Sequence, residues 1–118
     1  RIGALLDDWP GPTLNLCGAT SPVTSAVAMR TAKFYLGHDS GPMHLAALIG
    51  LRCVAVFSAR AKPGVWFPHG GGHEVLYPWH EADAVPPKTG LRTAGGSILS
   101  ITVDDVVGAC MRVLSCAA

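Results

Sequence analysis

The chain has 118 residues, the length of one domain, and 49% of them are hydrophobic whereas 14% are charged. A formal net charge of +1 gives no electrostatic case for binding nucleic acid or an anionic membrane. No apolar run approaches the ~20 residues of a membrane span, and no signal peptide is recognisable. We therefore expect a single domain, residues 1–118, with a substantial core.

The first third of the chain shows three elements in turn. Residues 2–9 have the pattern of the end of a helix, which Pro10-Gly11-Pro12 closes. Residues 13–17 have a strand pattern. A second helix begins at Thr20-Ser21-Pro22, where a hydroxyl cap precedes a proline, and continues over 23–32. Its predicted inward face comprises Val23, Ala26 and Val27.

The middle of the chain continues the alternation of strand and helix. Residues 33–37 form a predicted strand, a turn and a helix ending at Gly50 follow, and residues 52–57 form a nearly all-apolar strand. A continuously apolar strand is typical of a sheet that helices cover on both faces. This order predicts an α/β fold with a parallel sheet, right-handed crossovers and flanking helices.

The last part of the chain is less regular. Residues 58–72 form a long loop rich in Gly and Pro, which in a compact domain is typically functional or mobile. A fourth strand is predicted at 73–77, and we assign no structure to residues 78–97. A closing helix over 104–115 is capped by Thr102. Its predicted buried stripe comprises Val103, Val106, Val107, Cys110, Val113 and Leu114.

Four cysteines are present, none in a C-x-x-C pair: Cys17, Cys53, Cys110 and Cys116. Each lies in apolar surroundings. We interpret them as buried, reduced thiols of a cytoplasmic protein, with a disulfide or metal framework as the alternative.

The turn after the strand at 33–37 carries the clearest chemical signal. Ligands of open α/β sheets collect beyond the carboxyl ends of strands, where Asp39, Ser40 and Gly41 are expected. Free N–H groups at a helix start favour phosphate. Gly41 would let an anion approach the backbone, Ser40 would add a hydroxyl donor, and His44 would donate from the first turn. Pro42 fits that turn because its missing N–H would have no intrahelical partner.

A plainer interpretation of the same turn is open from the spacing alone. Asp39 or Ser40 would cap the helix, and His44 would be a hydrogen-bonded histidine near the core. The turn matches neither G-x-x-x-x-G-K-[ST] nor G-x-G-x-x-G. The three residue types of a hydrolytic triad occur here, but they are too close in sequence for the usual relay, and no G-x-S-x-G motif is present.

A group of histidines farther along could be interpreted as metal ligands. It comprises His69, His73 and His80, with Glu74 nearby. The glycines at 70–72 would leave the ligand geometry loose, so a solvated loop is the favoured interpretation. We predict no metal site.

The run Asp39-Ser40-Gly41-Pro42-Met43-His44, set between an apolar strand and a strand ending Val56-Phe57, resembles glycosyltransferase family 9. That family includes the ADP-heptose:lipopolysaccharide heptosyltransferases. The resemblance extends to Thr20-Ser21, to Trp66-Phe67-Pro68 and to residues 101–106. It implies part of the C-terminal, nucleotide-sugar-binding domain of a GT-B fold, in which two Rossmann-like domains enclose the active site.

The resemblance implies roles for the residues of the turn. Ser40, Gly41 and Pro42 would hold the donor diphosphate through backbone and hydroxyl groups. His44 would support the phosphates, and Asp39 would orient the turn or touch the donor sugar. Such enzymes generally need no metal, because the helix start and nearby side chains stabilise the departing diphosphate. The implied substrate is a nucleotide-sugar such as an ADP-sugar.

Other positions are implied less directly. Thr20 and Ser21 match the stretch beside the nucleoside, and Lys62 with Trp66 could close over a nucleotide or acceptor sugar, with ordinary loop packing as the alternative. Residues 57–64 depart from the Phe-Gly and Thr-Asp-Pro-like turn that is usual in the family, which leaves the donor open.

The resemblance also implies absent parts. The family's catalytic base belongs to an N-terminal acceptor domain that this chain would lack, so we expect the chain alone to be inactive. The parent protein would transfer a sugar, with heptose as the candidate, to a lipopolysaccharide-type or other glycan acceptor, in the cytoplasm or at the inner face of the inner membrane. The alternatives are a non-catalytic nucleotide-binding module and a structural α/β module.

Missing strands would leave a gap in the sheet. In the strand order 3-2-1-4-5-6, residues 13–17 would form the third strand and residues 33–37 the fourth, with two absent strands between them. Unpaired edges favour association. We therefore predict a homodimer, strand exchange, or direct pairing of 13–17 with 33–37.

Overall fold

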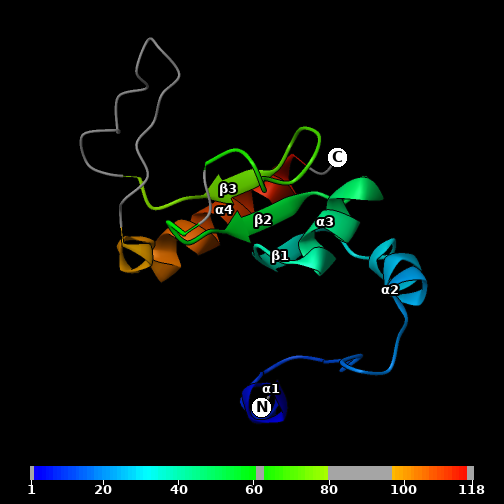
Figure 1. Ribbon diagram of the computed structural model, residues 1–118. Coiled ribbons are helices and arrows are strands. Elements are labelled where there is room, and N and C mark those ends of the chain that lie inside the picture. Colours follow the sequence, from blue (N-terminus) through cyan, green and yellow to red (C-terminus); the bar gives the residue numbers. More distant parts are fainter. Residues whose placement is uncertain (1, 61–62, 80–96, 117–118) are drawn as a thin grey trace.

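The computed structural model describes residues 2–60, 63–79 and 97–116 (Figure 1). In this part of the chain, the elements follow one another as α1 (Ile2–Asp7), α2 (Pro22–Met29), β1 (Tyr35–His38), α3 (Gly41–Leu48), β2 (Cys53–Val56), β3 (Glu74–Leu76), the 3-10 helix η2 (Ile98–Ser100) and α4 (Val103–Ser115). None of the helices in these ranges is long and apolar enough to cross a bilayer.

The three strands form one parallel sheet in the order β1-β2-β3. Tyr35 lies opposite Cys53, and Val54 lies opposite Glu74. The predicted strands at 33–37, 52–57 and 73–77 are confirmed within two residues at each end. The predicted α/β class with a parallel, Rossmann-like sheet and flanking helices is also confirmed.

Helices cover the sheet on both faces (Figure 1). On one face α3 packs over a core whose buried members are Met43, Ala46, Ala47, Cys53, Ala55, Phe57 and Tyr77. On the other face α4 packs over a smaller core of Val54, Ala109 and Val113. Successive residues of β2 therefore enter opposite cores, which is why the strand is apolar throughout.

Helix α3 ends where the sequence predicted. It stops at Leu48, and Gly50 adopts φ +81°. A glycine takes this left-handed conformation at no steric cost, whereas other residues resist it. The turn brings the chain directly into β2, and Leu51 N–H donates to Ala46 O at 3.0 Å.

The predicted strand at 13–17 is wrong. This stretch has no strand structure, and Leu14 is 79% exposed. Asn15 Oδ1 accepts from Cys17 N–H at 3.0 Å, and Ala19 N–H donates to Leu16 O at 3.1 Å, so local turns take the place of strand pairing. A strand is stable only beside another strand, and no described strand lies beside this stretch. The expected direct pairing with 33–37 is therefore not observed.

The predicted inward faces of two helices need correction. Val23 and Val27 of α2 are exposed, and Ser25 and Met29 instead face the cleft beside α3. In α4, only Ala109 and Val113 are fully buried. Its exposed residues include three of the predicted stripe, Val103, Val107 and Leu114. Both helices have broad apolar surfaces, and one neighbouring layer covers only part of each.

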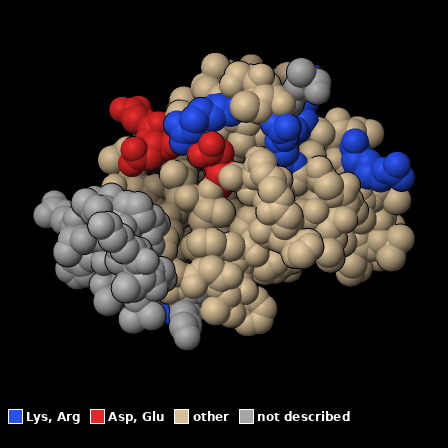
Figure 2. Space-filling model, turned by 90° about the horizontal axis from the view of Figure 1, so that it is seen from above, with Lys and Arg blue, Asp and Glu red and all other residues tan. Residues whose placement is uncertain are grey.

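Charged side chains are sparse on this surface. Figure 2 shows most of the charged side chains in view along the upper edge, next to a wide area without charge. An ion pair connects helix α4 to strand β3: Arg112 Nη2 donates to Glu74 Oε2 at 3.0 Å. The pair is partly solvated, so we expect it to position α4 rather than to add much stability.

Helix α4 begins with the predicted Thr102 cap. Thr102 Oγ1 accepts from Asp105 N–H at 3.1 Å, and Asp105 Oδ2 accepts from Thr102 N–H at 2.8 Å. This reciprocal arrangement is a capping box. The hydrogen bond from the Thr102 backbone, with a second from its hydroxyl, lowers the pKa of Asp105.

The lowered pKa predicts a loss of stability in acid. A carboxyl whose pKa is lower in the folded than in the unfolded chain stabilises the fold above its unfolded pKa. That contribution is lost as the pH falls from about 5 through the lowered value. Urea denaturation from neutral to acid pH should show a smaller decrease in stability for Asp105→Asn than for the wild type. Asp104→Asn is the control, and an equal effect of both variants would contradict the assignment.

The interpretation of the cysteines is half right. All four are free, but Cys17 and Cys116 are exposed, whereas Cys53 is buried and Cys110 is partly buried. Cys17 is exposed because its predicted strand does not form. Burial raises the pKa of the Cys53 thiol to about 11.

This difference predicts selective alkylation. At pH 8 the folded chain should react with iodoacetamide at Cys17 and Cys116 and be protected at Cys53, because the thiolate is the nucleophile and access is required. Mass spectrometry of tryptic peptides would measure each site. Denaturant should equalise the rates, and rapid modification of Cys53 in the folded state would contradict the described burial.

A candidate anion site at the start of helix α3

The candidate site begins where β1 ends. His38 closes the strand, and Ser40 is the extended residue before α3. Contrary to the plainer interpretation, the Ser40 side chain makes no capping bond; its Oγ donates to His38 O at 3.2 Å. Among the described residues, the N–H groups of Ser40 and Gly41 have no hydrogen-bond partner. The start of α3 therefore presents unsatisfied donors and the positive end of the helix dipole.

Neither the packing nor the backbone conformation at position 41 requires a glycine. A Cβ built on it meets no atom within 4 Å, and its φ is outside the left-handed region. Neither packing nor backbone conformation thus excludes a side chain here, and glycine costs a helix roughly 1 kcal/mol relative to alanine. Its effect is to leave the backbone at the helix start uncovered.

His44 lies between a carboxylate and an indole ring. Its Nε2 is 3.7 Å from Asp39 Oδ1, and both side chains are about one-third exposed (34% and 35%). The ring of Trp66 meets His44 edge-on, with centroids 6.1 Å apart and an angle of 66°. The turn after β1 and the loop after β2 therefore meet at His44, at the carboxyl end of the sheet.

Trp66 is held in place by its neighbour. Phe67 packs against Phe57 at a centroid distance of 5.0 Å and against Tyr77 at 6.0 Å. These contacts anchor the loop to the larger core and leave Trp66 half exposed beside α3. Lys62, its predicted companion, lies outside the described residues.

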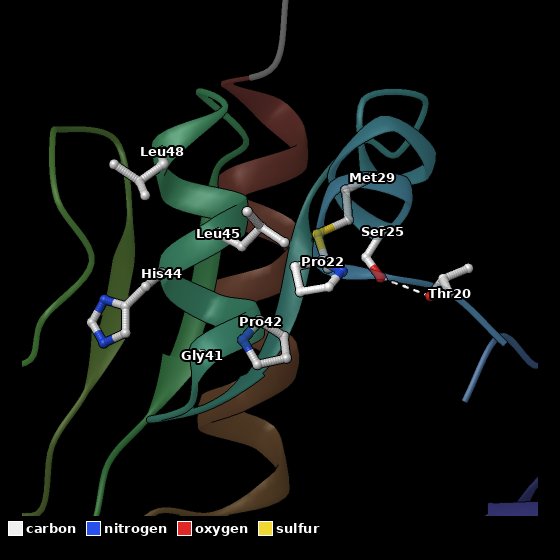
Figure 3. Close-up of a pocket in the computed structure, with 9 residues that line it drawn as sticks. All are labelled: Thr20, Pro22, Ser25, Met29, Gly41, Pro42, His44, Leu45 and Leu48. Atoms are coloured by element: carbon white, nitrogen blue, oxygen red, sulfur yellow. Dashed lines mark hydrogen bonds between the residues drawn. The ribbon is translucent and has the colours of Figure 1, made fainter. Parts of the chain in front are cut away.

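A cleft of about 470 Å³ opens between α2 and α3 (Figure 3). It is lined by Thr20, Pro22, Ser25, Met29, Gly41, Pro42, His44, Leu45 and Leu48. Figure 3 shows Pro42 and Leu45 pointing from α3 toward Pro22 and Met29. The lining is largely apolar, with the uncovered backbone of Gly41 at one end.

The cleft brings together four of the predicted site residues, namely Thr20, Gly41, Pro42 and His44. Thr20 Oγ1 is 2.7 Å from Ser25 Oγ. Ser21 instead caps α2, where its Oγ accepts from Thr24 N–H at 3.2 Å, and it does not line the cleft. Asp39 and Ser40 lie at the helix start outside it.

Sequence reasoning missed the rest of the lining, which comprises Ser25 and the apolar residues Pro22, Met29, Leu45 and Leu48. Helical spacing carries a signal for part of it, since Pro22, Ser25 and Met29 follow one another at intervals of three and four residues. The helix pair α2 and α3 leaves this row partly uncovered, so it lines a cleft instead of filling a core.

Hydrogen bonds to the backbone occupy His73, one of the histidines of the loop before β3. His73 Nδ1 accepts from Cys53 N–H at 3.1 Å, and its Nε2 donates to His69 O at 3.0 Å. Both ring nitrogens of His73 are therefore hydrogen-bonded to backbone groups. In the described part of the chain, no cluster of three or more His, Cys, Asp or Glu residues could hold a metal ion. His80 lies outside the described residues.

The comparison with protein families decides the identity of this arrangement. A model described as glycosyltransferase family 9 (heptosyltransferase) matches residues 1–83, well over half of the chain. The chain belongs to glycosyltransferase family 9. No curated protein and no solved structure matches it.

The family match spans α1 to β3 and therefore contains the whole candidate site. The turn between β1 and α3, which resembled this family in sequence, lies in its interior. Helix α4 lies beyond the matched residues. Membership in family 9 associates the fold with transfer of a glycosyl group, and the roles of Asp39, Ser40, Gly41, Pro42 and His44 remain predictions.

Proposed function

We propose that this chain binds the nucleotide-sugar donor of a family 9 glycosyltransferase. In this proposal the diphosphate lies at the start of α3 and the nucleoside lies in the cleft between α2 and α3. One observation carries the proposal: the uncovered backbone of Gly41 joins a helix start with free donors to an apolar cleft of about 470 Å³. A nucleoside diphosphate has the matching parts, an anion beside a flat, largely apolar base.

The polar groups of the site suit a diphosphate. The N–H groups of Ser40 and Gly41 would donate to phosphate oxygens, and a His44 nitrogen would add a further donor. The carboxylate of Asp39 orients His44 and also repels an anion, so we place it on the side of the donor sugar. In this arrangement the helix start and His44 stabilise the diphosphate without a metal ion.

The proposed transfer needs a second domain. We propose that an acidic residue of an N-terminal acceptor domain deprotonates the acceptor hydroxyl and that the diphosphate departs at α3. The candidate sugar is heptose and the candidate acceptor is a lipopolysaccharide-type or other glycan at the inner face of the inner membrane. The chain alone would bind the donor without transferring the sugar.

Calorimetric titration of this chain with ADP, UDP and their sugars tests the proposal. Saturable binding to one of them is expected, with the diphosphate required and the nucleoside alone binding more weakly. If no nucleotide bound at millimolar concentration, the chain would be a structural α/β module. If a nucleotide does bind, transfer assays with a protein that joins this chain to an acceptor domain would separate a transferase from a non-catalytic nucleotide-binding module.

His44→Ala should weaken ADP binding by about 1–3 kcal/mol, because a hydrogen bond from this ring to a charged phosphate would be lost. Trp66→Phe should retain most of the affinity, since phenylalanine can still pack against His44. His69→Ala is the matched control, because the His69 ring is exposed and lies outside the cleft. Equal affinities for the His44 and His69 variants would show that His44 has a structural role and does not donate to the phosphate.

A further inference from the structure

We propose that His73 makes the attachment of one loop end to the sheet dependent on pH. The neutral His73 ring holds residues 69–73, which we call the histidine turn, against the start of β2, and a proton on the ring releases the turn. This inference does not depend on the proposed function, because it concerns the amino end of β2, whereas the start of α3 lies at the carboxyl end of the sheet.

The two hydrogen bonds of His73 determine which nitrogen carries the hydrogen. Cys53 N–H can only donate, so Nδ1, at 3.1 Å from Cys53 N, must present a lone pair. The carbonyl of His69 can only accept, so Nε2, at 3.0 Å from His69 O, must carry the hydrogen. The structure therefore accommodates the neutral ring. An imidazolium has N–H groups at both nitrogens, and it would direct one of them at Cys53 N–H.

The His73 ring supplies an acceptor that the sheet lacks at this place. Between β2 and β3, Phe57 N–H donates to Leu76 O at 2.9 Å. Because every second residue of a strand points its N–H to the same edge, the acceptor for Cys53, four residues earlier, would be the carbonyl of residue 72. Gly72 instead adopts φ +79°, and β3 begins only at Glu74. The imidazole nitrogen takes the place of that carbonyl.

The glycines of the turn bring the ring to this position. Gly70 adopts φ +100° and Gly72 adopts φ +79°, which is the left-handed region that glycine enters without a steric penalty. A Cβ built on Gly70 would lie 3.6 Å from His73 Nε2, so the ring lies directly beside the turn that it closes. Before the turn, Pro68 is buried and Phe67 packs on Phe57. Release is therefore confined to residues 69–73.

A positive charge near the turn favours the neutral ring. The guanidinium of Arg52 lies against the turn, because its Nε is 3.4 Å from the position of a Cβ built on Gly72. A proton on the His73 ring would place a second positive charge close to it. Neither ion pair in the described part of the chain includes His73.

The other titratable groups around the ring offer it no free negative charge; they are the His69 imidazole, the Cys53 thiol and the Glu74 carboxylate. The His69 imidazole is exposed, and only the backbone carbonyl of this residue takes part in the turn. Burial raises the pKa of the Cys53 thiol to about 11, so this group is uncharged. The Glu74 carboxylate is paired with Arg112 of α4 at 3.0 Å. Protonation of His73 therefore has no local compensation for the lost hydrogen bond.

Amide hydrogen exchange measured by NMR at pH 7.5 and pH 5.5 tests the proposal, because histidine changes its charge in this range. After correction for the intrinsic effect of pH on exchange, the protection of the Cys53 amide should fall about tenfold at the lower pH, as one hydrogen bond is lost. The Ala55 amide, in the middle of β2, is the internal control and should keep its protection. Unchanged protection of Cys53 would overturn the proposal, and so would an equal fall at Ala55.

Two variants assign the effect to the ring. In His73→Asn the side chain cannot be protonated in this range, so the protection of the Cys53 amide should be the same at both pH values. His69→Asn is the matched control, because it keeps the backbone carbonyl and should retain the pH dependence of the wild type. Persistence of the pH dependence in His73→Asn, or its loss in His69→Asn, would contradict the assignment.

Imidazole nitrogen chemical shifts of the wild-type chain give a test that needs no variant. At pH 7.5 they should place the hydrogen of His73 on Nε2. A hydrogen on Nδ1 would exclude the bond from Cys53 N–H and overturn the proposal.

Discussion

Replacement of Gly41 by valine should abolish nucleotide binding and leave the fold intact. A Cβ at this position meets no protein atom within 4 Å, so the added side chain projects into the space beside the helix start. That space is where the proposed diphosphate must approach the N–H of Gly41. Loss of a charge-assisted hydrogen bond together with a steric clash should weaken binding by about a hundredfold or more.

Calorimetry with ADP would measure the loss, and thermal denaturation would confirm the fold. Gly71→Val is the matched control, because that glycine also has open space around it and no left-handed φ, and it lies in the loop before β3. The two variants should unfold alike and differ only in binding. Undiminished affinity of the Gly41 variant would show that the diphosphate does not bind at the start of α3.

Phe57→Ala should lower the free energy of unfolding by about 3–5 kcal/mol, the range for a large aromatic residue removed from a core. Phe57 is fully buried, and it meets Phe67 edge-on at 5.0 Å. Because the free energy of unfolding of a single domain is about 5–15 kcal/mol, this loss is a large part of the total stability. Loosening of Phe67 should also release the neighbouring Trp66 from its position beside His44.

Urea denaturation followed by circular dichroism would measure the change. Val65→Ala, in the same loop but more than half exposed, should alter stability by less than about 0.5 kcal/mol. A shift in the tryptophan emission of Phe57→Leu that disappears when Trp66 is also replaced by Phe, with the fold retained, would report the expected link between core and site. A stability change for Phe57→Ala as small as that of Val65→Ala would contradict the described core.

The strands and the strand–turn–helix of the site were predictable because local pattern and burial agree there. The β2 sequence is apolar because both of its faces are covered, and Gly50 marks a helix end through a conformation that only glycine adopts readily. The cap of α4 was equally local, since Thr102 and Asp105 are three residues apart. Such signals need no knowledge of distant contacts.

The wrong predictions concern elements whose structure or burial depends on a neighbouring element. Residues 13–17 alternate like a strand, but strand structure depends on a neighbour that the sequence cannot supply. The exposed stripe of α4 likewise shows that helical periodicity identifies apolar faces without telling which of them is covered.

The sequence placed Gly41 and His44 at the turn between strand and helix without showing the shape of the cleft, and their roles stay predictions. The hydroxyl cap before Pro22 was predicted, and Ser21 supplies it. The contact between His44 and Trp66 was not predictable, because it joins residues far apart in sequence. The shape of the cleft depends on the angle at which α2 packs against α3, and that angle cannot be inferred from the sequence of either helix alone.

The position of α4 has a practical consequence for expression. The family match ends at residue 83, yet α4 supplies Ala109 and Val113 to the core on its side of the sheet. A shortened gene with its boundary set by sequence similarity would leave Val54 and its neighbours facing water. We expect such a product to accumulate in inclusion bodies, whereas one that extends to residue 116 should be recovered from the clarified lysate.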